Sequence, residues 1–101
     1  MIHYEYINER GRLLAERIAQ SLKQEKNREE YEAIVFIGAL GICVRKILPL
    51  VNSKYTDPAV ICVDTTGKYV IPVLSGHVGG ANNLARLIAN SIDAEAIITT
   101  Q

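Results

Sequence analysis

The chain has 101 residues, of which 49% are hydrophobic and 22% are charged. Eleven Lys and Arg residues balance eleven Asp and Glu residues, so no net basic charge points to nucleic acid or to an anionic membrane as a partner. This length is typical of one folded unit, and we expect residues 1–101 to form a single α/β domain.

The cysteines and the N-terminus predict a cytoplasmic protein. Cys43 and Cys62 lie in apolar runs without metal-ligand spacing, which indicates buried thiols in a reducing compartment rather than a disulfide. The first residues lack the layout of a signal peptide. No apolar run approaches the roughly 20 residues that a membrane span needs.

The N-terminal part of the chain predicts a strand followed by a helix. Alternating residues from Ile2 to Ile7 predict a short strand that suits the edge of a sheet. Asn8 is predicted to cap a helix that extends to about Lys26, because apolar residues recur there at helical spacing. The charged connection that follows is expected to be solvated.

Three apolar runs predict the central strands. Ala33–Ile37 is continuously apolar, as in strands covered on both faces, and Ala59–Val63 and Tyr69–Val73 follow. The turn Asp64–Lys68 predicts a hairpin, so the last two strands should pair antiparallel. Pro72 predicts an edge or a bulge in the second of them.

Ile42–Val51 and Ala81–Ile92 predict two more helices, and Ala96–Thr100 predicts a final strand. The order βαβαββαβ indicates a three-layer Rossmann-like α/β domain with a mixed, mostly parallel sheet and one β-hairpin. Because the chain stops directly after an apolar strand, we expect either that more chain originally followed or that a partner covers this edge. A homo-oligomer or a separate subunit would provide that cover.

The most informative segment is a glycine-rich loop between a predicted strand and a predicted helix. Glycine lets the backbone approach a ligand, and the helix that follows would direct its free N–H groups and positive dipole end at this loop. A histidine within the loop can exchange protons near neutral pH. We therefore predict an anion-binding site with His77 as its catalytic residue, formed by Ser75, Gly76, Gly79, Gly80, Asn82 and Asn83. A structural turn, a structural imidazole and asparagines that only cap the helix remain alternatives.

A second glycine turn, Gly38 to Gly41, also joins a predicted strand to a predicted helix. It fails as a dinucleotide fingerprint, because Leu40 and Cys43 stand where the second and third glycines are needed. We expect both glycine turns to line one shared cleft, in which Arg45 meets a substrate carboxylate. Arg45 could equally be a solvated helix residue. Thr56-Asp57-Pro58 is interpreted as a structural cap and turn.

Three motifs at this spacing resemble the N-terminal region of the cobalamin-biosynthesis protein CbiG, the cobalt-precorrin-5A hydrolase family. The resemblance extends from Ala33 to Thr100, through AIVFIGALGICVRKILPLV, KYTDPAVICVD, YVIPVLSGHVGGANNLARLIA and AIITT. Relative to that family, the segment before Ala33 is shortened and a C-terminal domain is absent. The chain could therefore be one domain of the enzyme, a split subunit or a relict.

The resemblance implies a role in the anaerobic route to the corrin ring. Members of the family open the ring A δ-lactone of cobalt-precorrin-5A and release acetaldehyde. The implied partner is this carboxylate-rich tetrapyrrole, and cobalt would arrive within the substrate rather than as a cofactor or a protein-bound metal. We interpret His77 as the base and the Gly79 and Gly80 amides as oxyanion donors. A non-catalytic tetrapyrrole-binding or assembly module is the alternative.

Overall fold

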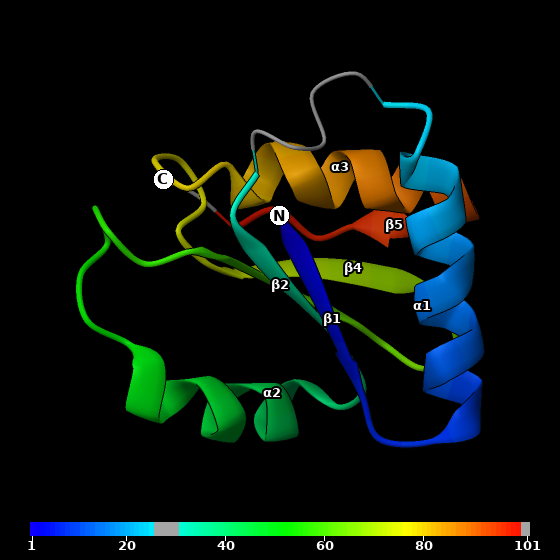
Figure 1. The fold of residues 1–101 in the computed structure, drawn as a ribbon, viewed down its shortest axis with the longest axis horizontal. Helices are drawn as coiled ribbons and strands as arrows, with labels where there is room; N and C mark the ends of the chain where they lie inside the picture. Colours follow the sequence, from blue (N-terminus) through cyan, green and yellow to red (C-terminus); the bar gives the residue numbers. More distant parts are fainter. Residues whose placement is uncertain (26–30, 100–101) are drawn as a thin grey trace.

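The computed structural model describes residues 1–25 and 31–99. A five-stranded sheet in the order β1-β2-β3-β4-β5 lies between helices on both of its faces (Figure 1). The elements are β1 (Ile2–Tyr6), α1 (Glu9–Leu22), β2 (Ala33–Ile37), α2 (Leu40–Ile47), the 3-10 turn η2 (Leu48–Leu50), β3 (Ala59–Val63), β4 (Tyr69–Leu74), α3 (Ala81–Ile92) and β5 (Glu95–Ala96). The predicted three-layer α/β fold with a mixed, mostly parallel sheet is confirmed.

The strand directions follow the predicted pattern. The pairs β1–β2, β2–β3 and β4–β5 are parallel, whereas β3 and β4 form the predicted antiparallel hairpin. The predicted place of β1 at a sheet edge is confirmed. The β3–β4 register shifts between Val60 and Ile61, and Ile61 faces Pro72, so the bulge predicted from this proline is also present.

The last strand is shorter than predicted. β5 contains only Glu95 and Ala96, after which the Ile97 N–H still donates to the Val70 carbonyl at 2.9 Å. The next donor along β4 would be Pro72, which has no N–H, so the ladder ends there. Thr100, the last residue of the predicted strand, lies outside the described residues.

Asn8 caps α1 as predicted, since its side chain accepts a hydrogen bond from the Gly11 N–H at 2.9 Å. The described helix ends at Leu22, the last residue of its buried stripe. Residues 23–25 are not helical, so α1 ends earlier than the predicted end near Lys26, a residue that itself lies outside the described ones. None of the helices in the described part of the chain has the length and apolar content to cross a membrane.

The two faces of the sheet are covered unequally (Figure 1). Helices α1 and α3 pack together over one face and build the larger core, whereas α2 alone covers the other. The smaller core under α2 consists of Phe36, Cys43, Ile47, Val60 and Cys62. Both cysteines are free and buried, as predicted, and Cys62 Sγ donates to the Gly38 carbonyl at 3.3 Å.

The outer surface of α2 and of the η2 turn carries large hydrophobic residues beside the exposed Arg45 and Lys46. No other element in the described part of the chain covers this outer surface (Figure 1). We use the name "α2 face" for the exposed large hydrophobic residues of α2, of η2 and of the residue that follows, which are Leu40, Ile42, Val44, Leu48, Leu50 and Val51.

The hairpin turn is held by the Asp64 carboxylate. Its oxygens accept hydrogen bonds from the backbone N–H groups of Thr66, Lys68 and Tyr69 at 3.2, 2.9 and 2.7 Å. The pKa of Asp64 lies below its usual value. Partial burial acts to raise this pKa, but the hydrogen bonds from the Thr66 hydroxyl and from these three N–H groups outweigh burial and lower it.

We predict that Asp64→Ala lowers the free energy of unfolding by about 1 kcal/mol near neutral pH, because the partly exposed carboxylate is screened by water. A lowered folded-state pKa gives stability that is present above the unfolded-state pKa of about 4 and is lost as the pH falls through the folded-state value. Urea unfolding should therefore show the difference from wild type shrinking toward pH ~3. Glu16→Ala, which removes an exposed ion pair with Arg12, should cost less at neutral pH. Equal costs would contradict the assignment.

Candidate functional site

The loop from β4 to α3 folds back onto the first turn of α3. Ser75 has a φ of 61° and Gly80 a φ of 80°, so the chain turns sharply at both ends of the loop. The Ala81 N–H donates to the Ser75 carbonyl and the Asn82 N–H to the Gly76 carbonyl, both at 3.1 Å. The loop itself therefore satisfies the first helical N–H groups.

One expected oxyanion donor is already used inside the loop. The Gly80 N–H donates to the His77 carbonyl at 3.2 Å, so the expectation that this amide is available to a ligand is wrong in this structure. The Gly79 N–H donates to no other described residue, so its role as a donor stays a prediction, and the loop also offers a ligand its side chains. The positive end of the α3 helix dipole still favours electron-rich groups near the loop.

The loop glycines have an internal packing role. A Cβ on Gly79 would lie 2.6 Å from Ser75 Cβ and 3.0 Å from the Ser75 carbonyl oxygen. A Cβ on Gly76 would lie 2.9 Å from Asn82 Oδ1. Both glycines are needed to close the loop around its own atoms, whether or not a ligand also approaches them.

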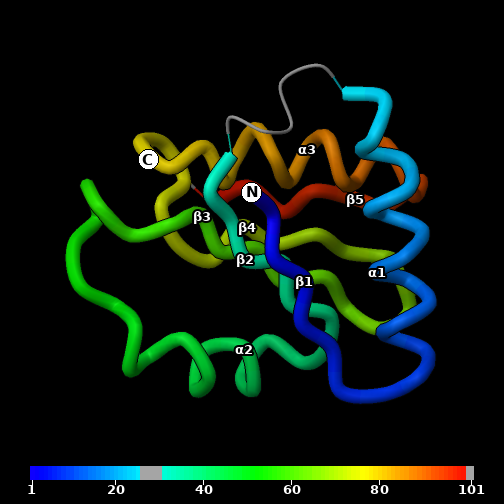
Figure 2. Tube along the Cα trace, viewed as in Figure 1, coloured from blue at the N-terminus to red at the C-terminus, as the bar shows by residue number. Residues whose placement is uncertain are grey.

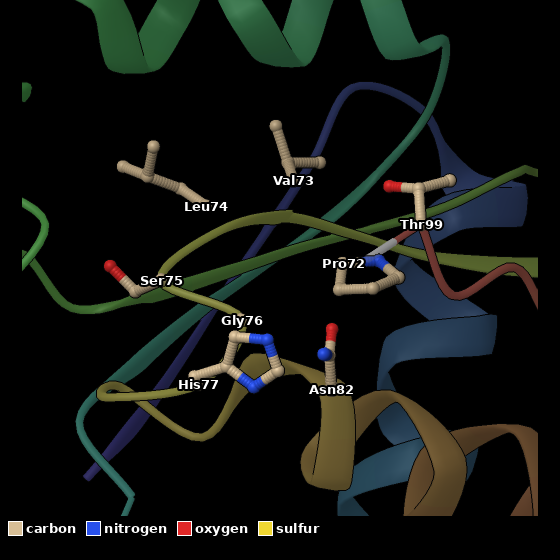
Figure 3. Close-up of a pocket in the computed structure, with 8 residues that line it drawn as sticks. All are labelled: Pro72, Val73, Leu74, Ser75, Gly76, His77, Asn82 and Thr99. Atoms are coloured by element: carbon tan, nitrogen blue, oxygen red, sulfur yellow. The ribbon is translucent and has the colours of Figure 1, made fainter. Parts of the chain in front are cut away.

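A cavity of about 570 Å³ opens between this loop and β4. Figure 3 shows the imidazole of His77 beside the side-chain amide of Asn82, which points from the first turn of α3 toward Pro72. The structure thus brings several predicted site residues together. The lining consists of Pro72, Val73, Leu74, Ser75, Gly76, His77, Asn82 and Thr99.

Asn82 and Asn83 face different surroundings. Asn83 is exposed, and its Oδ1 accepts a long hydrogen bond from Arg86 Nη1 at 3.4 Å. Asn82 is only 7% exposed, and its side chain makes no hydrogen bond to another described residue. No side-chain polar atom in the described part of the chain is both fully buried and unpaired, so the polar atoms of Asn82 still reach solvent through the cavity that they line and are free to bind a ligand there.

A second cavity of about 450 Å³ lies on the other side of the loop, lined by Glu32, Thr56, Asp57, Pro58, Val78 and Gly79. Both oxygens of the buried Asp57 carboxylate accept hydrogen bonds from the Asn52 N–H, at 3.1 and 3.0 Å. The Ser75 hydroxyl donates to the Asp57 backbone carbonyl at 3.1 Å. The structural interpretation of Thr56-Asp57-Pro58 is confirmed, and its anchoring of the loop is a role that we did not predict.

The predicted shared cleft is wrong. Gly38 lies at the end of β2, where its N–H donates to the Val63 carbonyl at 2.9 Å, whereas Ser75 lies beside Asp57, ahead of β3. Because β4 runs antiparallel to β2 and β3, its carboxyl end lies at the opposite end of the sheet from theirs. The trace in Figure 2 shows the two glycine turns on opposite sides of the molecule.

The residues of the first glycine turn are therefore separated from the cavity. Gly38 has a φ of 156°, and a Cβ there would lie 2.8 Å from the Phe36 ring. Packing alone therefore explains why this position is a glycine. A Cβ added to Gly41 would have no neighbour within 4 Å. Arg45 is exposed on α2 and lines neither cavity. Whether these three residues bind substrate stays a prediction.

The described residues contain no obvious metal site. Within residues 1–25 and 31–99, no three His, Cys, Asp or Glu side chains gather as metal ligands would. The expectation that the protein holds no metal of its own stays a prediction.

The fold and the loop define an α/β domain with a ligand-sized cavity where a strand leads into a helix. The family described as "Cobalamin synthesis G N-terminal" matches residues 23–101, and the chain belongs to this family. The predicted family resemblance is therefore confirmed.

Two relatives are called cobalt-precorrin-5A hydrolase. The one from Salmonella typhimurium is 54% identical over 70 residues, which are 69% of this chain and 20% of the relative. The one from Priestia megaterium is 49% identical over 72 residues, or 71% of this chain and 19% of the relative. The match thus spans about a fifth of the length of these relatives.

The crystal structure of a cobalamin biosynthesis protein G homolog from Sulfolobus solfataricus has the same fold. It superimposes with a TM-score of 0.81 at 31% identity, covering 97% of this chain and 36% of the homolog.

We predict that Gly79→Ala lowers the free energy of unfolding by about 1–3 kcal/mol, because a methyl group would overlap Ser75 and open the loop. Gly41→Ala is the matched control. It meets no neighbour and lies in a helix, where alanine is favoured over glycine by about 0.5–1 kcal/mol. Urea unfolding of both variants measures the contrast. A Gly79→Ala protein as stable as wild type would contradict the packing described here.

Proposed function

We propose that this chain is the N-terminal domain of a cobalt-precorrin-5A hydrolase and acts in the anaerobic route to cobalamin. The observation that carries the proposal is that two of the three motifs meet at one end of the sheet. Ser75 of the glycine-rich motif is anchored on Asp57 of the second motif, and a cavity opens on each side of the loop. A relative called cobalt-precorrin-5A hydrolase is 54% identical to this chain over the aligned residues.

The proposed substrate is cobalt-precorrin-5A, whose ring A lactone is opened by water with later release of acetaldehyde. The cobalt travels within the tetrapyrrole, so the domain needs no cofactor of its own. His77 is placed at the cavity mouth, exposed and beside the buried amide of Asn82. We assign it the role of the base that takes a proton from the attacking water.

A cavity of about 570 Å³ that is open to solvent suits one edge of a macrocycle rather than the whole. The remaining contacts and the exclusion of water would come from the part of the hydrolase that lies outside the match, which is about four-fifths of the relatives' length. We propose that this part docks on the α2 face, either in one chain or as a separate subunit, because that face exposes six large hydrophobic side chains.

A binding or assembly module remains the second candidate function. A catalytic base is usually oriented by a third group, yet the His77 imidazole makes no hydrogen bond to another residue in the described ranges. A domain that only holds and passes on a corrinoid would not need that orientation. We assign either activity to the cytoplasm, since both thiols are free and buried.

We predict that His77→Ala lowers the rate of acetaldehyde release in the assembled hydrolase by about 10²–10⁴-fold with little change in substrate affinity. The measurement is acetaldehyde production from cobalt-precorrin-5A across substrate concentrations. Equal saturated rates for wild type and His77→Ala would leave the loop as a binding element and favour the second candidate.

We also predict that Leu48→Ser combined with Leu50→Ser weakens docking of the rest of the enzyme at least about tenfold, because these two side chains are the most exposed of the α2 face. The partner in the assay is the unmatched part of the Salmonella hydrolase, expressed separately and titrated calorimetrically. Leu13→Ser on α1, which is also exposed, should have no effect. Loss of binding in the control, or docking untouched by the double change, would contradict this placement.

A further inference from the structure

The side chain of Asn82 is buried in the cavity wall without a hydrogen-bond partner among the described residues. Its backbone is fixed, because its N–H donates to the Gly76 carbonyl at 3.1 Å. Its side-chain atoms sit directly over Gly76, where an added Cβ would lie 2.9 Å from Oδ1 and 3.3 Å from Nδ2. The amide is therefore held in one place, and its remaining 7% exposure is into the cavity.

The cavity has neutral donors but no cation. No Lys or Arg lines it in the described part of the chain, and its polar groups come from Ser75, His77, Asn82 and Thr99. The Ser75 hydroxyl proton is already used, since it goes to the Asp57 carbonyl. A free carboxylate is usually met by Arg or Lys, whereas neutral N–H donors at a helix N-terminus suit a carbonyl oxygen that gains charge during reaction.

We propose that this cavity receives the lactone carbonyl of the substrate and that the side-chain N–H of Asn82 donates to its oxygen. This inference rests on the proposed function. As water adds to the carbonyl carbon, His77 takes a proton and the C=O electron pair moves to the oxygen, where Asn82 stabilises it. The pair then re-forms C=O, the C–O bond to the ring oxygen breaks, and that oxygen receives the proton. The product carries a carboxylic acid and a hydroxyl group.

The assignment explains two features together. It gives a partner to an amide whose polar atoms otherwise meet only the cavity, and it explains why Gly76 has no side chain, since any Cβ would displace the donor. It also replaces the Gly80 amide, which donates to the His77 carbonyl, with a donor that is free.

The direct test uses the isolated chain, labelled with ¹⁵N, and two small probes. δ-Valerolactam has the ring and carbonyl of a δ-lactone but resists hydrolysis, and acetate represents a free carboxylate. We expect saturable shifts of the Asn82 side-chain NH₂ signals with the lactam and none with acetate. Shifts with acetate but not with the lactam, or no saturable shift with either probe, would overturn the proposal.

Asn82→Asp is the matched variant, because it keeps the size of the side chain and replaces both N–H donors with an acceptor. Lactam binding should weaken about five- to a hundredfold at neutral pH. It should recover on acidification, when the introduced carboxyl is protonated and donates again. The fold should persist, since a negative charge in the first helical turn is favourable. Asn90→Asp adds the same charge to an exposed asparagine of α3 outside the cavity and should bind the lactam like wild type.

Titration with cobalt-precorrin-5A separates this inference from the proposed function. If the lactam binds and the corrinoid does not, the proposed function fails while the cavity retains its carbonyl site. If Asn82→Asp binds the lactam as wild type does at every pH, Asn82 is not the donor and the inference fails, whatever the corrinoid does.

Discussion

The antiparallel pairing of β3 with β4 determines where the site lies. Asp64 closes the hairpin by accepting three backbone hydrogen bonds, and the reversal sends the end of β4 back to the start of β3. Ser75 then meets Asp57, and the second and third sequence motifs share one end of the sheet. With a parallel β4, the same loop would lie beside Gly38, and the site would be built from different residues.

Most of the fold could be predicted because its signals are local. The runs Ala33–Ile37 and Ala59–Val63 become strands with the predicted bounds, and Ala81–Ile92 becomes a helix with the predicted bounds. The shared cleft failed for a reason that the sequence also contained. The predicted antiparallel hairpin already places the end of β4 at the opposite end of the sheet from the ends of β2 and β3, which is incompatible with a shared cleft. Strand order and direction, rather than element type, decide which loops meet.

The loop shows how a glycine-rich motif can be interpreted in two ways. Glycine at a strand-to-helix turn suggests backbone contacts with a ligand, and here the loop uses Gly76 and Gly79 to pack against Asn82 and Ser75. The sequence could mark these positions but could not separate Asn82 from Asn83, because both follow the glycines. Their burial separates them, since only Asn82 turns into the cavity wall.

The central claim is that the corrinoid binds at the loop end of the sheet, between β4 and α3. Hydrogen–deuterium exchange of the chain with and without cobalt-precorrin-5A tests it most directly. The account predicts slower exchange in residues 75–82 and 56–59, and unchanged exchange in residues 38–41. Protection of residues 38–41 without protection of residues 75–82 would contradict it.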